Sequence, residues 1–175
     1  LFIVQALLML NCGEASVKDS QSGLYINAAA GFLLLLTTPG PKTISVDKEG
    51  KWRDFYYDLP FLWVLGYTIW NFTFVSGSYP HMYRMHIAVL LAAVVPAYFN
   101  NKLWNQARGF TLGGHFLFQL FLDNPKGEGF FKTVGMTEKF PKEYYPFFAM
   151  LSLAIMVIHV GMVIKGHYEK KQEVS

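Results

Sequence analysis

Cysteine is almost absent from this sequence, in which Cys12 is the single example among 175 residues. One cysteine excludes an internal disulfide framework, and it also excludes a zinc site or an iron–sulfur cluster held by several cysteines. Charge is scarce as well, because Asp, Glu, Lys and Arg make up 15% of the chain, whereas soluble domains carry about 25%. Since 53% of the residues are hydrophobic, the composition is that of a membrane protein.

Sequence motifs of catalysis are missing too. The chain has no CxxCH, HExxH or phosphate-binding loop, and no nucleophile, base and acid are arranged as an acyl-transfer enzyme requires. Its net charge of +3 comes from basic residues scattered over several loops, which excludes nucleic acid as a partner. No internal repeat or heptad supports an inverted-repeat transporter. The sequence therefore favours a protein without catalytic activity.

Long apolar runs are what the sequence contains instead. A helix needs roughly 20 residues to cross about 30 Å of hydrocarbon. We predict an all-α fold, a polytopic transmembrane helix bundle that forms a single membrane domain over residues 1–175. The expected spans are residues 1–12 (partial), 22–38, 56–76, 81–99, 104–122 and 144–165. The first run, LFIVQALLML, begins without Met, so we expect the chain to be a fragment or a processed product.

Lysine and arginine are distributed unevenly between the two sides of this expected bundle. One side holds eight of them, in loops 39–55 and 100–103 and in the tail, and the other side holds six. The positive-inside rule places the richer side in the cytoplasm or its organellar equivalent. We therefore expect an integral protein of a cytoplasmic or organellar inner membrane, with its C-terminus on the cytoplasmic side.

The run at residues 104–122 carries side chains that lipid does not tolerate alone. At about 100° per residue, one line along this helix contains Trp104, Arg108, Leu112, His115 and Gln119. Gly109 and Gly113 lie on another face, where the backbone of a second helix can approach closely. This run is therefore predicted to have a polar face and a packing face.

Depth along the helices indicates partners for the polar face. Counting about 1.5 Å per residue from the more basic side places His115 level with Tyr67, Asn71 and His86. Arg108 lies nearer the surface, level with His159 and Asp58. Together with Gln119, these residues form the candidate site, which is either a buried polar cluster or a ligand pocket.

The roles of these charged and imidazole side chains stay open at the level of sequence. Arg108 either pairs with Asp58 or with helix-end carbonyls for folding, or faces a cavity that holds an anionic headgroup or solute. His86 and His115 either make interior hydrogen bonds or ligate the metal of haem or chlorophyll. No carboxylate-rich metal pattern accompanies them, so lipid is the first candidate ligand, and haem or chlorophyll is the second.

Three segments carry a resemblance to a known family: DLPFLWVLGYTIWNFTF, HIAVLLAAVVPAYF and WNQARGFTL. They resemble a family of uncharacterised polytopic membrane proteins, mainly bacterial, with Tyr-x-x-Trp-Asn and Trp-x-x-x-Arg-x-x-Thr-Leu motifs on helices. The resemblance covers about residues 54–113, and its motif residues here are Asp58, Tyr67, Trp70, Asn71, Pro96, Trp104, Arg108, Thr111 and Leu112. It implies that Asp58, Tyr67, Asn71 and Arg108 form one grouping, and it implies no activity.

Three functions are consistent with these features. The first is a non-catalytic integral membrane subunit or accessory protein of a larger membrane assembly, with the lipid bilayer and other membrane protein subunits as partners. The second is a small-solute or ion transporter whose pocket lies between Tyr67, Asn71, Arg108 and His115. The third is a haem- or chlorophyll-binding subunit that uses His86 and His115. We favour the first, because it requires the fewest groups that the sequence does not contain.

Overall fold

The structure is a computed structural model that describes residues 22–49, 54–122, 129–135 and 138–174. These residues are mostly helical, which confirms the predicted all-α class, and the expected partial span 1–12 lies outside them. The helices are α2 (Ser22–Leu36), α3 (Phe61–Ser78), α4 (Tyr83–Phe99), α5 (Trp104–Leu122), α6 (Phe130–Thr133) and α7 (Tyr145–Val174). The strands are β1 (Ile44–Val46) and β2 (Phe55–Tyr57), and the 3₁₀ turns are η1 (Pro41–Thr43), η2 (Pro80–Met82), η3 (Asn101–Leu103) and η4 (Lys142–Tyr144).

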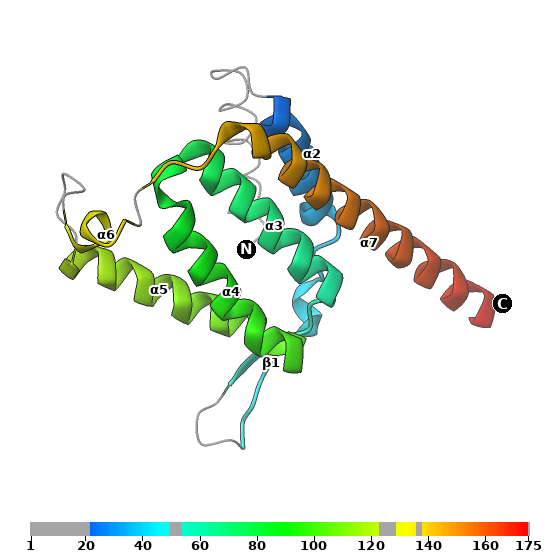
Figure 1. The fold of residues 1–175 in the computed structure, drawn as a ribbon. Coiled ribbons are helices and arrows are strands. Elements are labelled where there is room, and N and C mark those ends of the chain that lie inside the picture. The colour runs from blue at the N-terminus through cyan, green and yellow to red at the C-terminus, as the bar shows by residue number, and fades with distance from the viewer. Residues whose placement is uncertain (1–21, 50–53, 123–128, 136–137, 175) are drawn as a thin grey trace.

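Helix α3 lies at the centre of the arrangement (Figure 1). Helices α2 and α7 pack against each other and against α3, α4 packs against α3, and α5 packs against α4. Figure 1 shows α5 and α7 extending away from the centre in different directions. Because α5 packs mainly on α4, much of its surface is not covered by the other residues that the structure describes.

A short β-hairpin precedes α3, and the sequence analysis did not predict it. Strands β1 and β2 are antiparallel, with Ile44 opposite Tyr57. The sequence places the start of a span at residue 56, but the helix begins at Phe61. Pro60 explains this boundary, because a proline lacks the backbone N–H that an interior helical hydrogen bond needs and is favoured where a helix starts.

The ends of two other helices also differ from the expected spans. Helix α2 ends at Leu36, and the hydroxyl of Thr37 donates back to the carbonyl of Leu33 at 2.7 Å. Pro39 lies three residues beyond Leu36 and cannot donate the backbone hydrogen bond that would extend the helix. Helix α7 continues to Val174, well past residue 165, since the segment KGHYEKKQEV has no proline and is rich in residues that favour helix.

Glycines mark the places where helices of the bundle approach closely. Gly31 of α2 lies against the indole of Trp70 on α3, and a β-carbon added at this glycine would lie 2.6 Å from Trp70 Nε1. Gly66 of α3 lies in the same way against Met156 of α7. The side-chain amide of Asn27 adds a polar link, because it donates to the carbonyl of Trp70 at 3.1 Å. The small residues thus hold α2, α3 and α7 together.

Two helical segments among the described residues are long and apolar enough to cross a membrane. They are Pro80–Phe99, which contains α4, and Lys142–His167, which contains most of α7. The segment Leu24–Leu36 of α2 is a shorter apolar helix. Length and apolarity therefore identify α4 and α7 as the candidate spans of the described chain.

Candidate functional site

Five of the residues singled out from the sequence come together in the fold. Asn71 accepts hydrogen bonds from His86 and Arg108, the hydroxyl of Tyr67 lies near Arg108, and His115 interacts electrostatically with Arg108 and His86. We call these five residues the polar cluster. Tyr67 and Asn71 belong to α3, His86 to α4, and Arg108 and His115 to α5. Because three helices contribute, the polar cluster exists only in the folded bundle.

Asn71 is the shared acceptor of the polar cluster. Its Oδ1 lies 2.6 Å from His86 Nε2 and 3.4 Å from an Nη atom of Arg108. A guanidinium only donates hydrogen bonds, so the amide oxygen rather than the amide nitrogen must face it. The same oxygen faces His86, and His86 therefore donates from Nε2. This assignment makes His86 a donor that helps to hold Asn71 in place, and its burial near the Arg108 cation disfavours a positive charge on its ring.

Arg108 is buried, with 8% of its surface exposed. Its guanidinium donates to the Asn71 side chain and lies near the hydroxyl of Tyr67, and both groups are neutral. Its Nε and Nη1 atoms are buried without a hydrogen-bond partner among the described residues. Among the described residues, no carboxylate forms an ion pair with it. The polar cluster therefore contains a cation whose charge these residues do not balance.

Aromatic rings enclose the Arg108 side of the polar cluster. The ring of Tyr67 stacks on Trp63 with centroids 5.6 Å apart, and its edge meets Trp104 at 4.9 Å. Trp104 lies one turn before Arg108 on α5 and is 2% exposed. Its indole Nε1 has no hydrogen-bond partner among the described residues. Trp63 and Trp104 thus pack around the ring of Tyr67, which belongs to the polar cluster.

Asp58, Gln119 and His159 lie outside the polar cluster. Asp58 is exposed and pairs with Lys102 at 3.9 Å, so the expected pairing of Asp58 with Arg108 is wrong. His159 is buried on α7, which packs on α2 and α3 and not on α5. Gln119 is half-buried on α5, one turn beyond His115. The shallow layer that the sequence analysis expected is therefore not formed.

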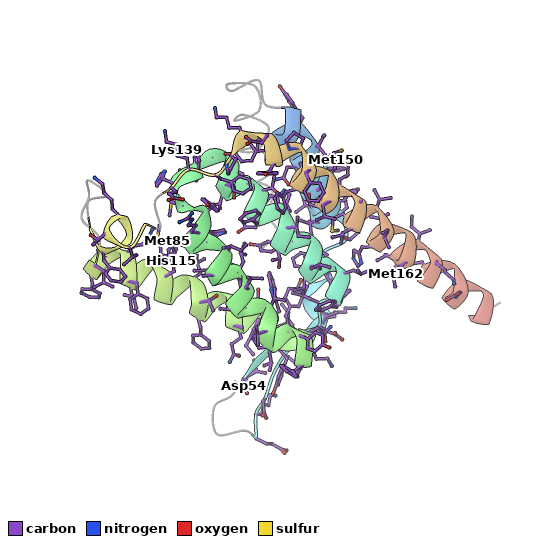
Figure 2. The ribbon with its side chains drawn as sticks, viewed as in Figure 1. Asp54, Met85, His115, Lys139, Met150 and Met162 are labelled. Carbon is purple, nitrogen blue, oxygen red and sulfur yellow. The ribbon has the colours of Figure 1, made fainter. Side chains whose placement is uncertain are left out.

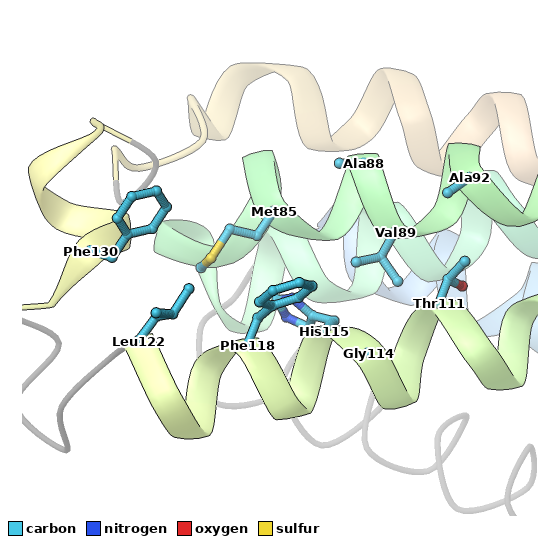
Figure 3. Close-up of a pocket in the computed structure, with 10 residues that line it drawn as sticks. All are labelled: Met85, Ala88, Val89, Ala92, Thr111, Gly114, His115, Phe118, Leu122 and Phe130. Carbon is cyan, nitrogen blue, oxygen red and sulfur yellow. The ribbon is translucent and has the colours of Figure 1, made fainter.

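An open apolar groove of about 580 Å³ lies between α4 and α5 beside the polar cluster. Figure 3 shows side chains of the two helices facing one another across it, with Phe130 of α6 at one end. Its lining is Met85, Ala88, Val89, Ala92, Thr111, Gly114, His115, Phe118, Leu122 and Phe130. Figure 2 shows His115 beside Met85 in this seam. His115 belongs to both the groove and the polar cluster, so it connects them.

The sequence analysis did not single out Gln106, which attaches the hairpin to α5. Its Oε1 accepts from the backbone amide of Phe55 at 2.6 Å, and its Nε2 donates to Asp54 at 2.9 Å. Figure 2 labels Asp54 at the hairpin. A single glutamine carries no spacing signal, and neither do the apolar residues that line the groove. These contacts become visible only when helices and hairpin are placed in space.

The polar cluster fits an anion better than a metal ion. No group of three or more His, Cys, Asp or Glu side chains that could hold a metal occurs in the part of the chain that the structure describes. The Nε2 atom of His86 is engaged with Asn71, which leaves Nδ1 as its remaining ligand atom. Arg108 instead supplies a permanent positive charge and N–H donors that lack acceptors.

The fold and the polar cluster define the class of protein, a helical bundle that buries a cation among neutral hydrogen-bonding side chains. The chain belongs to DUF5692, a family of unknown function, which matches residues 8–175. This match extends well beyond residues 54–113, which carry the resemblance described above. No curated protein and no solved structure matches the chain.

Proposed function

We propose that this protein is an integral membrane protein and acts as a non-catalytic subunit of a larger membrane assembly. The supporting observation is the distribution of side chains on α5, which is the reverse of that on a helix of a water-soluble protein. On this helix Arg108 is 8% exposed, whereas Phe110 is 72% and Phe121 is 78% exposed. In water, this arrangement would leave large apolar surface uncovered while it desolvates a charge. In a bilayer, the same apolar surface meets acyl chains or another protein.

The outer surfaces of α4 and α7 support the membrane location. Many of their exposed side chains are large and apolar, and these include Ile87, Leu91, Val95, Phe147, Met150, Val157, Ile158 and Met162. In the proposed arrangement, α4 and α7 cross the bilayer, and α2, α3 and α5 complete a polytopic bundle beside them. The C-terminus lies on the cytoplasmic side or its organellar equivalent, in agreement with the distribution of Lys and Arg.

Glycines on α5 support the role as a subunit. A β-carbon added at Gly109 or Gly113 would meet nothing within 4 Å. By contrast, Gly31 and Gly66 lie in close contact with side chains of neighbouring helices. Glycines four residues apart allow a second helix to pack closely in a membrane. We therefore propose that the face with Gly109 and Gly113 packs against a helix of another subunit.

The test is the mass of the native assembly after extraction in mild detergent. We expect the wild-type protein to migrate as part of a complex, and Gly113→Leu to release it as a monomer because the new side chain blocks close helix packing. The matched control is Gly161→Leu on α7, another exposed glycine with open space around it, and this variant keeps the complex. A wild-type protein that is a monodisperse monomer would overturn the subunit role.

A further inference from the structure

Three N–H donors on α5 have no acceptor among the residues that the structure describes. They are Trp104 Nε1, Arg108 Nε and Arg108 Nη1, and all three are buried. Both side chains lie beside Tyr67, because Trp104 packs on the ring of Tyr67 and Arg108 lies near its hydroxyl. Buried donors in folded proteins are normally satisfied by a protein group, a water molecule or a ligand. A group of donors without acceptors therefore points to a ligand that supplies acceptor atoms.

The charge of the polar cluster narrows the class of that ligand. Arg108 carries one permanent positive charge. Its neighbours Tyr67 and Asn71 are neutral, and the burial of His86 near this cation disfavours a second positive charge. One monoanion balances this charge, whereas a dianion would leave an uncompensated negative charge in the interior. A carboxylate has the matching charge, and its two oxygens suit the N–H groups of a guanidinium.

The groove between α4 and α5 offers room for an apolar extension of the ligand. Its volume of about 580 Å³ falls within the range of roughly 300–1,000 Å³ for small-ligand sites. All its lining side chains are apolar except Thr111 and His115. Thr111 lies one turn from Arg108 and donates to its carbonyl at 3.3 Å, and His115 interacts electrostatically with the guanidinium. The polar end of the groove thus adjoins the polar cluster.

We infer that the polar cluster binds a carboxylate, and that the α4–α5 groove takes the hydrocarbon chain when this carboxylate belongs to a fatty acid. Arg108 supplies the positive charge, and Trp104 supplies a further N–H donor. His115 lies between the carboxylate and the hydrocarbon chain of the proposed ligand. This inference rests on the geometry of α3, α4 and α5, and it does not require the proposed assembly.

The test measures binding of radiolabelled palmitate and radiolabelled butyrate to the full chain in phosphatidylcholine nanodiscs. We expect saturable palmitate binding that Arg108→Gln weakens about 10- to 100-fold, because hydrogen bonds to charged groups are lost. Arg108→Lys keeps the charge but loses the planar fork, so it weakens binding less. The control is Arg84→Gln, because Arg84 pairs with Glu138 outside the polar cluster, and this variant binds as the wild type does.

A second pair of variants tests the groove without altering Arg108. Gly114 lines the groove, and a β-carbon there has open space around it, so Gly114→Leu fills the groove without a clash in the chain. We expect it to abolish palmitate binding and to leave butyrate binding intact, whereas Gly161→Leu changes neither. Butyrate binding without palmitate binding would assign the carboxylate to a small solute and overturn the role of the groove.

Two results would overturn the inference as a whole. It is overturned if folded wild-type protein binds neither acid, or if Arg108→Gln binds both as the wild type does. The first result would leave water as the occupant of the polar cluster. A monomeric wild-type protein that binds palmitate would overturn the proposed assembly and support this inference, so the two proposals fail separately.

Discussion

Replacing Asn71 with aspartate is expected to supply the polar cluster with the anion that the described chain lacks. The new carboxylate would take the place of Oδ1, which lies 3.4 Å from the Arg108 guanidinium. Opposite unit charges at that distance attract by about 5 kcal/mol at an effective dielectric constant of about 20. The desolvation of the new carboxylate opposes this attraction by several kcal/mol. We therefore expect Asn71→Asp to stay within about 2 kcal/mol of the wild type in free energy of unfolding.

Asn27→Asp is the matched control, because it makes the same change at a second buried asparagine. Asn27 donates to the carbonyl of Trp70 and accepts from the hydroxyl of Ser152, and both groups are neutral. A carboxylate buried against these two neutral groups is expected to destabilise the protein by about 3–5 kcal/mol. The two variants should therefore differ clearly, although the chemical change is identical.

The assay is unfolding in a denaturing detergent or urea, followed by tryptophan fluorescence for the wild type and both variants. Equal destabilisation by Asn71→Asp and Asn27→Asp would refute the reasoning, because it would show that Arg108 does not act as the neighbouring charge of Asn71. Asn71→Asp should also weaken palmitate binding about tenfold or more, since the internal carboxylate competes for the same donors. Unchanged palmitate binding in this variant would contradict the assignment of Arg108 as the site of the carboxylate.

Two further predictions concern the frame around the polar cluster. Gly31→Ala is expected to lower the free energy of unfolding by about 1–3 kcal/mol, because its β-carbon meets the rigid indole of Trp70; Gly161→Ala on α7 has open space and should leave it unchanged or raise it by up to about 1 kcal/mol in the same assay. Gln106→Ala removes the acceptor of the Phe55 amide. Hydrogen exchange at residues 44–57 should therefore rise, while exchange in α3 stays as in the wild type. Unchanged exchange in the hairpin would show that Gln106 does not hold it.

Part of the polar cluster follows from counting along the chain. Tyr67, Asn71, His86 and His115 were expected at one depth, and the structure places them together. Helix rise determines such levels, since each residue advances the chain by about 1.5 Å. Depth counting gave the wrong partners for Arg108, because a long side chain reaches beyond the level of its own backbone. Depth counting also gave no information on how each helix is rotated about its axis. It therefore grouped Asp58 and His159 with Arg108, although neither belongs to the polar cluster.

The periodicity of apolar residues in the sequence could not predict the hairpin or the groove. The sequence analysis placed residue 55 in a loop and residues 56 and 57 at the start of a span, whereas their pairing with residues 44–46 depends on a contact across a loop. A three-residue strand is too short to give an alternating pattern. The groove has no sequence signal either, because alanine, valine and methionine occur on any apolar helix face. Its presence depends on how α4 and α5 lie against each other.

The sequence by itself determined the helical class, the apolar character of the chain and the line of polar residues on α5, because these follow from composition and from the fixed rise and turn of a helix. Only the tertiary structure decided that Asn71 serves both His86 and Arg108, and that Arg108 has no carboxylate beside it among the described residues. The physical reason is that a hydrogen bond depends on distances and directions between helices. Local sequence sets the face that each helix presents, and packing sets what that face meets.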